Sequence, residues 1–418
     1  MSAKKFTILI PTRDRGDTLL YAIRSALSQD YSNFTVLVSD NASEDNTQEV
    51  VSSIKDERLR YVNTGRRLSM SHNWEFGLSH VSGGWVTVIG DDDGMMPGAL
   101  ERVSRMADET GLKAIRANGC RYQWPSLRGG KFGALAVDLG RGYRKIESGR
   151  ALHAVLSGKM DYTKLPMLYN GGFVSMELVE EAKSRGTDGL FFRSLNPDVY
   201  AAMVFSLLTE EYVYSDEPLA VNGASIHSGG TANFGLPAKN RKYDPAEKFW
   251  SEPNIVFHKN LPPAANGRPI LSPHAMVYEA YLQAEAFHDR KEISVDPAQQ
   301  LRIILREPRI RAVDIGPWAV SFARLHGIAP PWAVHPVFAL PARARATFAL
   351  VRTVALMLIQ GIRVLGTEAS PLRDVCEASV AANQIRMAAP GFFSRVSNAM
   401  GRIWHFLFVR PPNDNTIV

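Results

Sequence analysis

The sequence predicts an α/β protein with a mostly parallel sheet flanked by helices, followed by a helical C-terminal region. Over the first part of the chain, short β-rich runs alternate with amphipathic helical segments, which is the pattern of a sheet with crossover helices. Polar segments follow three of these runs directly. Prolines and further helical patterns follow residue 235.

Four β-rich runs mark the first strands, in the order FTILI (6–10), FTVLV (34–38), RLRYV (58–62) and WVTVI (85–89). Apolar residues recur at helical spacing after each strand, in the sets Leu20, Ile23, Leu27; Val50, Val51, Ile54; Met70, Trp74, Leu78; and Leu100, Val103, Met106. We expect Asp17 to cap the first of these helices and Pro97 to start the last.

Composition places the chain among ordinary globular proteins. Its 418 residues are 45% hydrophobic and 22% charged, enough for two or three domains. Two cysteines exclude a disulfide framework and favour a reducing compartment. The apolar run before Pro11 is too short for a signal peptide, so we expect a cytoplasmic location.

The net charge of +6 is concentrated near the C-terminus. Residues 337–418 hold nine Arg against four Asp and Glu, and the rest of the chain is nearly neutral. A basic tail without a zinc-finger or RNA-binding signature argues against a nucleic-acid partner.

Three consecutive carboxylates, Asp91, Asp92 and Asp93, follow the fourth predicted strand. Adjacent carboxylates repel one another and resist desolvation, so water, a helix dipole or a cation must compensate them. A solvated acidic turn and a site for Mg²⁺ or Mn²⁺ are both consistent with the triplet alone.

The triplet shares its predicted sheet edge with two other polar segments. PTRDRG (11–16) follows the first strand and SDNASED (39–45) follows the second. Ligands of open α/β sheets bind at the carboxyl ends of the strands, so the three segments together indicate a binding site. The chain has neither a G-x-G-x-x-G motif nor a P-loop, which excludes the usual dinucleotide and kinase-type sites.

Residues 6–47 and 83–100, which contain these segments, resemble family 2 glycosyltransferases. That family has the GT-A (Rossmann-like) fold and transfers sugars from nucleotide diphosphates with inversion. The resemblance is strong over residues 6–110, moderate to about 232 and absent beyond. It implies that Pro11, Thr12, Arg13, Asp40, Asn41 and Asp91 bind the nucleotide, and that Asp92 and Asp93 bind the metal. Gly90 departs from the family, which often has a further Asp there.

Asp198 is the candidate general base. In SLNPDVYAAMVFSLL, Asn196 can cap a helix and Pro197 suits its first position, which places Asp198 in the first turn. The resemblance implies the catalytic role. An Asp that only stabilises the helix dipole is the alternative.

Two further site residues rest on weaker signals. The Gly- and Ser-rich segment 222–235 contains His227, which could contact a metal or a phosphate or lie in an ordinary surface loop. Arg66 could contact the nucleotide or be a solvated charge.

We expect three regions: a GT-A catalytic domain (1–235), a Pro-rich linker and helical region (236–336), and a basic amphipathic tail (337–418). Helices over residues 345–363 and 391–410 would combine Arg with apolar and aromatic residues, a composition suited to anionic membrane surfaces. Packing of the tail on the catalytic domain is the alternative.

Together these features predict a metal-dependent inverting glycosyltransferase that uses a nucleotide-diphosphate sugar, such as a UDP-sugar, and Mn²⁺ or Mg²⁺. Its acceptor would be a glycan or a lipid-linked saccharide, and the tail would hold it on the cytoplasmic face of the inner membrane. A sugar nucleotidyltransferase and a catalytically silent nucleotide-sugar or glycan-binding subunit are the alternatives.

Overall fold

The structure is a computed structural model. It describes residues 3–128, 130–186, 188–228, 252–264, 267–270, 272–290, 293–306, 312–329, 363–365 and 371–388.

A single mixed sheet organises the described residues. Its main path runs in the order β11-β7-β6-β9-β4-β1-β2-β3, and β10 pairs with β5, β6 and β8. The strands are β1 (Phe6–Thr12), β2 (Phe34–Asp40), β3 (Leu59–Asn63), β4 (Trp85–Val88), β5 (Gly94–Met95), β6 (Ala114–Gln123), β7 (Ala134–Val137), β8 (Tyr143–Glu147), β9 (Gly172–Ser175), β10 (Glu211–Ala224) and β11 (Arg363–Leu365).

The predicted α/β class is confirmed, and its parallel part is the N-terminal one. β1 pairs in parallel with β2 and β4, and β2 pairs in parallel with β3. Beyond β4 the sheet is mixed, because β9 is antiparallel to both β4 and β6 while β10 is parallel to β6. The carboxyl ends of β1, β2 and β4 therefore meet at one edge.

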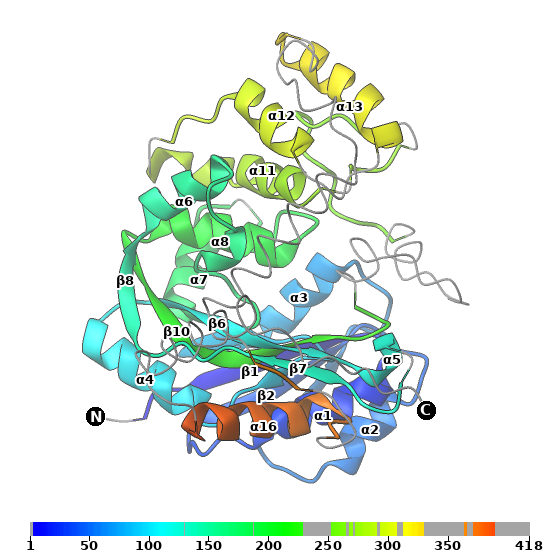
Figure 1. Ribbon diagram of the computed structural model, residues 1–418, viewed down its shortest axis with the longest axis vertical. Coiled ribbons are helices and arrows are strands. Elements are labelled where there is room, and N and C mark those ends of the chain that lie inside the picture. Colours follow the sequence, from blue (N-terminus) through cyan, green and yellow to red (C-terminus); the bar gives the residue numbers. More distant parts are fainter. Residues whose placement is uncertain are drawn as a thin grey trace, which may run out of the picture.

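Helices cover both faces of this sheet (Figure 1). Alternate strand residues bury themselves in two different cores: Leu9 and Leu37 belong to one, and Ile8 and Val36 to the other. The first core includes α3 (Met70–Ser79), α6 (Ser148–Leu156), α7 (Met176–Ser184) and α8 (Pro197–Leu208). The second includes α1 (Gly16–Leu27), α2 (Thr47–Ser53) and α4 (Ala99–Thr110). Short helical turns form α5 (Pro125–Arg128) and η1 (Tyr162–Lys164).

Two predicted helix starts are wrong by one or two residues. α1 begins at Gly16 after Arg15, so Asp17 lies in its first turn and does not cap it. α4 begins at Ala99, because Gly98 takes a left-handed conformation (φ 70°) after Pro97 and the chain turns there. α8 begins at Pro197 after Asn196 as predicted, although the Asn196 side chain makes no capping hydrogen bond.

The predicted helical region after the linker is present. α11 (Pro273–Gln283) packs on α8, and η2 (Glu285–Arg290), α12 (Pro297–Leu305) and α13 (Ala312–Leu325) follow it. Figure 1 shows these helices as a layer beyond α6 and α8.

Part of the predicted tail lies on the sheet. β11 pairs with β7, so Arg363 belongs to a strand and not to the predicted helix end. α16 (Val375–Ala388) packs against α1, β5, β7 and β10. The rest of the helix predicted over 345–363, and the whole of the one over 391–410, lie outside the described residues. In the described part of the chain, no helix has the length and apolar character needed to cross a bilayer.

We expect Gly223→Ala to destabilise the fold by about 1–3 kcal/mol or more. A Cβ at this position would stand 1.7 Å from the main-chain oxygen of Asp92, so β10 or the triplet loop would have to move. Gly316→Ala is the matched control, because no atom lies within 4 Å of its Cβ position. Urea unfolding measures both, and equal midpoints for the two variants would contradict the close approach.

Candidate active site

The Asp triplet at the end of β4 is buried. Asp91, Asp92 and Asp93 are 1%, 4% and 0% exposed, so the reading of a solvated acidic turn is wrong. Among the described residues, Arg15 is the cation that forms an ion pair with the triplet. Three buried carboxylates therefore have one paired arginine beside them, and each has a different set of contacts.

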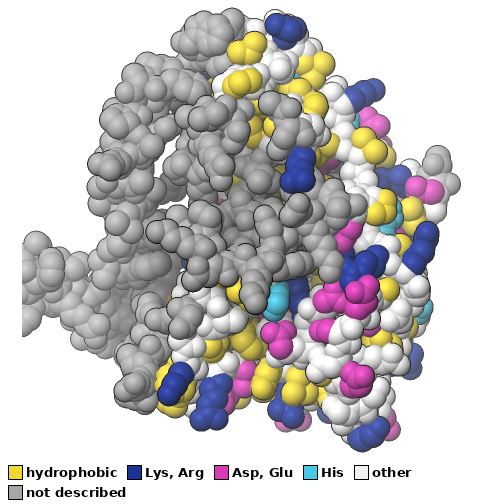
Figure 2. Space-filling view, turned by 90° about the vertical axis from the view of Figure 1, so that its right-hand side faces the viewer, with side chains coloured by type: hydrophobic (Ala, Val, Ile, Leu, Met, Phe, Trp, Pro, Cys, Tyr) yellow, Lys and Arg dark blue, Asp and Glu magenta, His cyan; other side chains and the backbone are white. Residues whose placement is uncertain are grey.

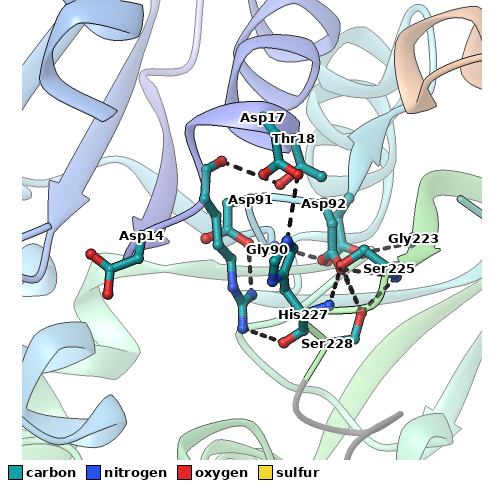
Figure 3. A network of polar contacts seen from close by, with 12 residues as sticks. Asp14, Asp17, Thr18, Gly90, Asp91, Asp92, Gly223, Ser225, His227 and Ser228 are labelled. Carbon is teal, nitrogen blue, oxygen red and sulfur yellow. Dashed lines mark hydrogen bonds and ion pairs between the residues drawn. The ribbon is translucent and has the colours of Figure 1, made fainter. Parts of the chain in front are cut away.

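Asp92 faces the loop that follows β10 (Figure 3). Its Oδ2 accepts hydrogen bonds from the hydroxyls of Ser225, at 2.6 Å, and Ser228, and from the amide of Ser225 at 3.2 Å. No described group donates to its Oδ1. The main-chain oxygen of Asp92 accepts the indole N–H of Trp124 at 2.8 Å, which fixes the backbone of the loop.

Asp93 is held by main-chain amides. Oδ1 accepts the N–H of Gly223 at 2.7 Å, and Oδ2 accepts the N–H of Gly90 at 2.8 Å. Burial, together with the neighbouring Asp92 charge, raises the pKa of Asp93 to about 7. Its carboxylate thus joins the end of β4 to β10.

Asp91 pairs with Arg15, whose Nη1 lies 2.8 Å from Oδ1. Burial raises the pKa of Asp91 despite this pair. Burial opposes the charge of Arg15, but Asp91 and Asp92 raise the pKa of the guanidinium above its usual value. Arg15 Nη2 also donates to the carbonyl of His227 at 2.6 Å, so it connects the end of β1 to the loop after β10.

His227 lies beside the triplet, as Figure 3 shows, and its ring turns toward α1. Its Nε2 is 3.4 Å from Oδ2 of Asp17 in the first turn of that helix. The hydrogen bond from His227 lowers the pKa of Asp17. The residue expected to cap α1 is thus a contact of the predicted metal-site histidine.

Asp40 and Asn41 shape the end of β2. Asp40 accepts the amide and hydroxyl of Ser43 at Oδ1, and Tyr61 and Asn63 donate to its Oδ2 at 2.5 and 3.0 Å. The amide group of Asn41 donates to, and accepts from, the main chain of Leu68, both at 2.7 Å. Both predicted nucleotide-binding side chains are thus held by protein contacts.

The predicted residues of the first loop lie at the same edge. Pro11 and Thr12 are the last residues of β1, paired with Ser39 and Asp40, and Thr12 is buried. Arg13 forms an ion pair with Glu252, which belongs to the second predicted region (236–336). Arg66 is exposed, and no described contact brings its side chain to the triplet, whereas Arg67 pairs with Asp14 at 2.9 Å.

Asp198 occupies the first turn of α8 as predicted. Burial raises its pKa, while the amides of Val199 and Asp198 itself, the Tyr162 hydroxyl and the charge of Arg116 lower it. Tyr169 is close enough to the triplet and to Asp198 for their charges to act on it. Burial, followed by the charges of Asp93, Asp92 and Asp198, raises the pKa of Tyr169 well above its usual value.

The comparisons with known proteins identify the part of the chain that carries the triplet. The model of glycosyl transferase family 2 matches residues 7–135, which span β1 to β7. Residues 7–135 form a glycosyl transferase family 2 domain. This glycosyltransferase domain holds every predicted nucleotide- and metal-binding residue except His227, which follows β10.

Two relatives are similar to part of this chain. The GalNAc(5)-diNAcBac-PP-undecaprenol beta-1,3-glucosyltransferase of Campylobacter jejuni is 34% identical over 108 residues, which are 25% of this chain and 35% of the relative. The succinoglycan biosynthesis protein ExoO of Rhizobium meliloti is 31% identical over 107 residues, which are 26% and 31% of the two chains. The chain thus spans about a third of the length of these relatives.

Solved structures also align with this chain. Staphylococcus aureus TarS 1-349 in complex with UDP-GlcNAc matches with a TM-score of 0.42 and 14% identity, over 88% of this chain and 98% of TarS 1-349.

No group of three or more His, Cys, Asp and Glu in the described part of the chain is arranged to hold a metal ion by itself. Mg²⁺ commonly takes only one or two carboxylates and completes its shell with water and substrate phosphates. Oδ1 of Asp92 fits that requirement. Asp93 is less suited, because main-chain N–H groups occupy both of its oxygens.

The sequence interpretation missed five residues of this site: Arg15, Asp17, Tyr169, Ser225 and Ser228. Arg15 and the two serines lie in the segments 11–16 and 222–235, which that interpretation assigned to the site. Their positions in the chain could therefore be predicted, but their contacts with Asp91 and Asp92 could not. Tyr169 carries no sequence signal, because only the fold brings it near carboxylates that are far apart in the chain.

Asp93→Asn should flatten the pH dependence of stability. An Asp whose pKa is about 7 when folded and ~3.9 when unfolded binds more protons in the folded state between those values, so wild-type stability falls as pH rises from ~4 to ~7. Asn cannot titrate. Urea unfolding between pH 4 and 8 measures this, with the surface variant Asp108→Asn as control, and parallel curves for Asp93→Asn and wild type would contradict the shift.

Proposed function

We propose that the chain is a metal-dependent inverting glycosyltransferase that moves a sugar from a nucleotide-diphosphate donor, such as a UDP-sugar, to a hydroxyl of a glycan or a lipid-linked saccharide. One observation carries the proposal. A buried carboxylate triplet with one paired arginine lies in the family 2 domain, and the charges of the triplet and of the partly buried Asp198 both act on the same residue, Tyr169.

The donor would lie across the carboxyl ends of β1, β2 and β4. Asp92 would hold the divalent metal through Oδ1, and the ring of His227 is a further candidate. The ion supplies a Lewis acid that neutralises the leaving diphosphate. Arg15 is already fixed between Asp91 and the His227 carbonyl, so its charge would bind phosphate with little reorganisation.

Asp198 would remove the proton of the acceptor hydroxyl as the hydroxyl oxygen attacks the anomeric carbon from the face opposite the diphosphate. That role needs an ionised carboxylate with useful basicity. Burial raises the proton affinity of Asp198, and the amides of the helix start limit the increase. Its position in the first turn of α8 supplies both effects: the burial that raises its pKa and the main-chain amides that limit the rise.

A lipid-linked acceptor is favoured by the name of one relative, an undecaprenol-PP glucosyltransferase. Such an acceptor would bring the enzyme to a membrane surface, as expected for a peripheral protein at the cytoplasmic face of the inner membrane.

The direct test is release of nucleoside diphosphate from a panel of UDP-, GDP- and dTDP-sugars, with Mn²⁺ or Mg²⁺ and with saccharide and polyprenyl-diphosphate saccharide acceptors. We expect acceptor-dependent release with a subset of donors. Tight donor binding without release for any acceptor would favour the silent-subunit alternative, and release of pyrophosphate from a nucleotide and a sugar phosphate would favour the nucleotidyltransferase.

Asp92→Asn should remove the metal-dependent part of donor binding. The amide oxygen can still accept from Ser225 and Ser228, so the loop contacts survive while the negative charge is lost. Calorimetry of UDP with and without Mn²⁺ measures the effect, with Asp108→Asn as control. An unchanged gain in affinity from Mn²⁺ would place the metal elsewhere.

Asp198→Asn should leave UDP affinity near wild type and lower the transfer rate by roughly 10²–10⁴-fold, the usual contribution of a general base. Steady-state kinetics with saturating donor measures the rate, and calorimetry measures binding. Near-normal turnover would return Asp198 to the role of a helix-start residue.

A further inference from the structure

Arg116 of β6 is a buried arginine whose hydrogen bonds go to main-chain carbonyls. The residue is only 8% exposed. Nε donates to the carbonyl of Thr163 at 2.6 Å, and Nη1 donates to the carbonyls of Tyr169 and Asn170, both at 2.8 Å. A single planar guanidinium thus joins two parts of the connection between α6 and β9, residue 163 and residues 169–170, to β6.

Each of these two parts carries a tyrosine near the candidate active site. Tyr162, next to Thr163 in η1, donates its hydroxyl to Oδ2 of Asp198 at 3.3 Å. Tyr169 is within reach of the charges of both Asp198 and the triplet. The loop after Tyr169 is fixed further, because Asn170 donates its N–H to Val88 at the end of β4 at 2.8 Å.

Arg116 is costly to bury, and a neutral donor could have satisfied the same carbonyls. Burial lowers the pKa of Arg116, and the charges that oppose this effect include Asp161 and Asp198. The titratable groups that face Asp198 are Tyr162 from η1, Arg116 from β6 and Tyr169 from the loop before β9. The positive charge of Arg116 therefore acts on the carboxylate that lies beyond the tyrosine.

We propose that Arg116 and Tyr162 are positioning residues for Asp198: Arg116 clamps the loop that carries Tyr162, and Tyr162 fixes the orientation and ionisation of the carboxylate. The proposal rests on the proposed function for its catalytic meaning. Its geometric part, the Arg116–loop–Tyr162–Asp198 chain, is independent of which sugar or acceptor is used.

Tyr162→Phe tests the last link. A hydrogen bond to the ionised carboxylate lowers its pKa, so loss of the hydroxyl should raise it. We expect the acid limb of the pH profile of kcat/KM to move up by about half a unit to one unit, so that activity below the limb falls roughly three- to tenfold. Donor affinity should stay unchanged. Tyr31→Phe is the matched control, because Tyr31 bonds to the carbonyl of Lys4 at the opposite edge of the sheet.

Arg116→Lys tests the clamp. Lysine keeps the charge but not the planar fork, so we expect kcat to fall at least tenfold with a smaller change in the pH limb than in Tyr162→Phe. A wild-type kcat in this variant, confirmed as folded by its thermal transition, would overturn the clamp.

A measurement that needs no turnover separates this proposal from the proposed function. The carboxyl ¹³C resonance of Asp198, assigned by its loss in Asp198→Asn, reports the ionisation of that group directly. We expect its titration midpoint to rise in Tyr162→Phe and not in Tyr31→Phe. An unchanged midpoint would overturn the positioning role even in an active enzyme. A raised midpoint in a protein that transfers no sugar would support the geometry and reject the proposed function.

Discussion

The site depends on keeping three adjacent carboxylates buried at the end of β4. Their mutual repulsion and desolvation oppose folding, so the surrounding chain must supply compensation. Asp93 receives it from the amides of Gly90 and Gly223, and this pair of contacts brings β10 against the triplet loop. Because the chain continues from β10 directly into the loop that holds Ser225 and His227, the same contacts position that loop beside Asp92.

Identical side chains acquire different properties from their surroundings. Asp93 has its oxygens filled by main-chain donors and serves the fold. Asp91 is neutralised by Arg15, which also binds the His227 carbonyl. Asp92 keeps Oδ1 free of described donors while hydroxyls occupy Oδ2. The hydroxyl contacts are exchangeable, since a serine can rotate away, which is why the proposed function assigns the metal to Asp92.

Strands β1 to β4 and the start of α8 could be predicted because their signals are local. Short β-rich runs mark the four strands, the acidic triplet marks the end of β4, and Pro197 marks the start of α8. The contacts of Arg116 could not be predicted, because an arginine in a β-rich run is ordinarily expected on the surface. Only the folded structure brings the carbonyls of residues 163, 169 and 170 to its guanidinium. The contact of Asp17 with His227 was missed for a related reason: an Asp at a helix start is already explained locally, as a helix cap.

The face of the protein in Figure 2 shows basic and acidic side chains of the described residues interspersed. The tail was interpreted from its concentration of arginines. Arg386 has a different use, since its guanidinium donates to the carbonyls of Asp138 and Gly140 beside β7. These hydrogen bonds stabilise the packing of α16 on the sheet.

The same packing limits how the membrane hypothesis can be examined. The carbonyl of Leu372 accepts hydrogen bonds from the Tyr122 hydroxyl at 3.0 Å and from the Gly133 amide at 2.7 Å, and Val375 and Ala378 complete a core with Tyr122 and Trp124. Trp124 in turn holds the backbone of Asp92. A truncation at Pro336 would remove this core and disturb the triplet, so loss of activity or of vesicle binding in such a variant would not isolate a membrane contact. Substitution of tail arginines outside 371–388 would preserve α16 and test charge alone.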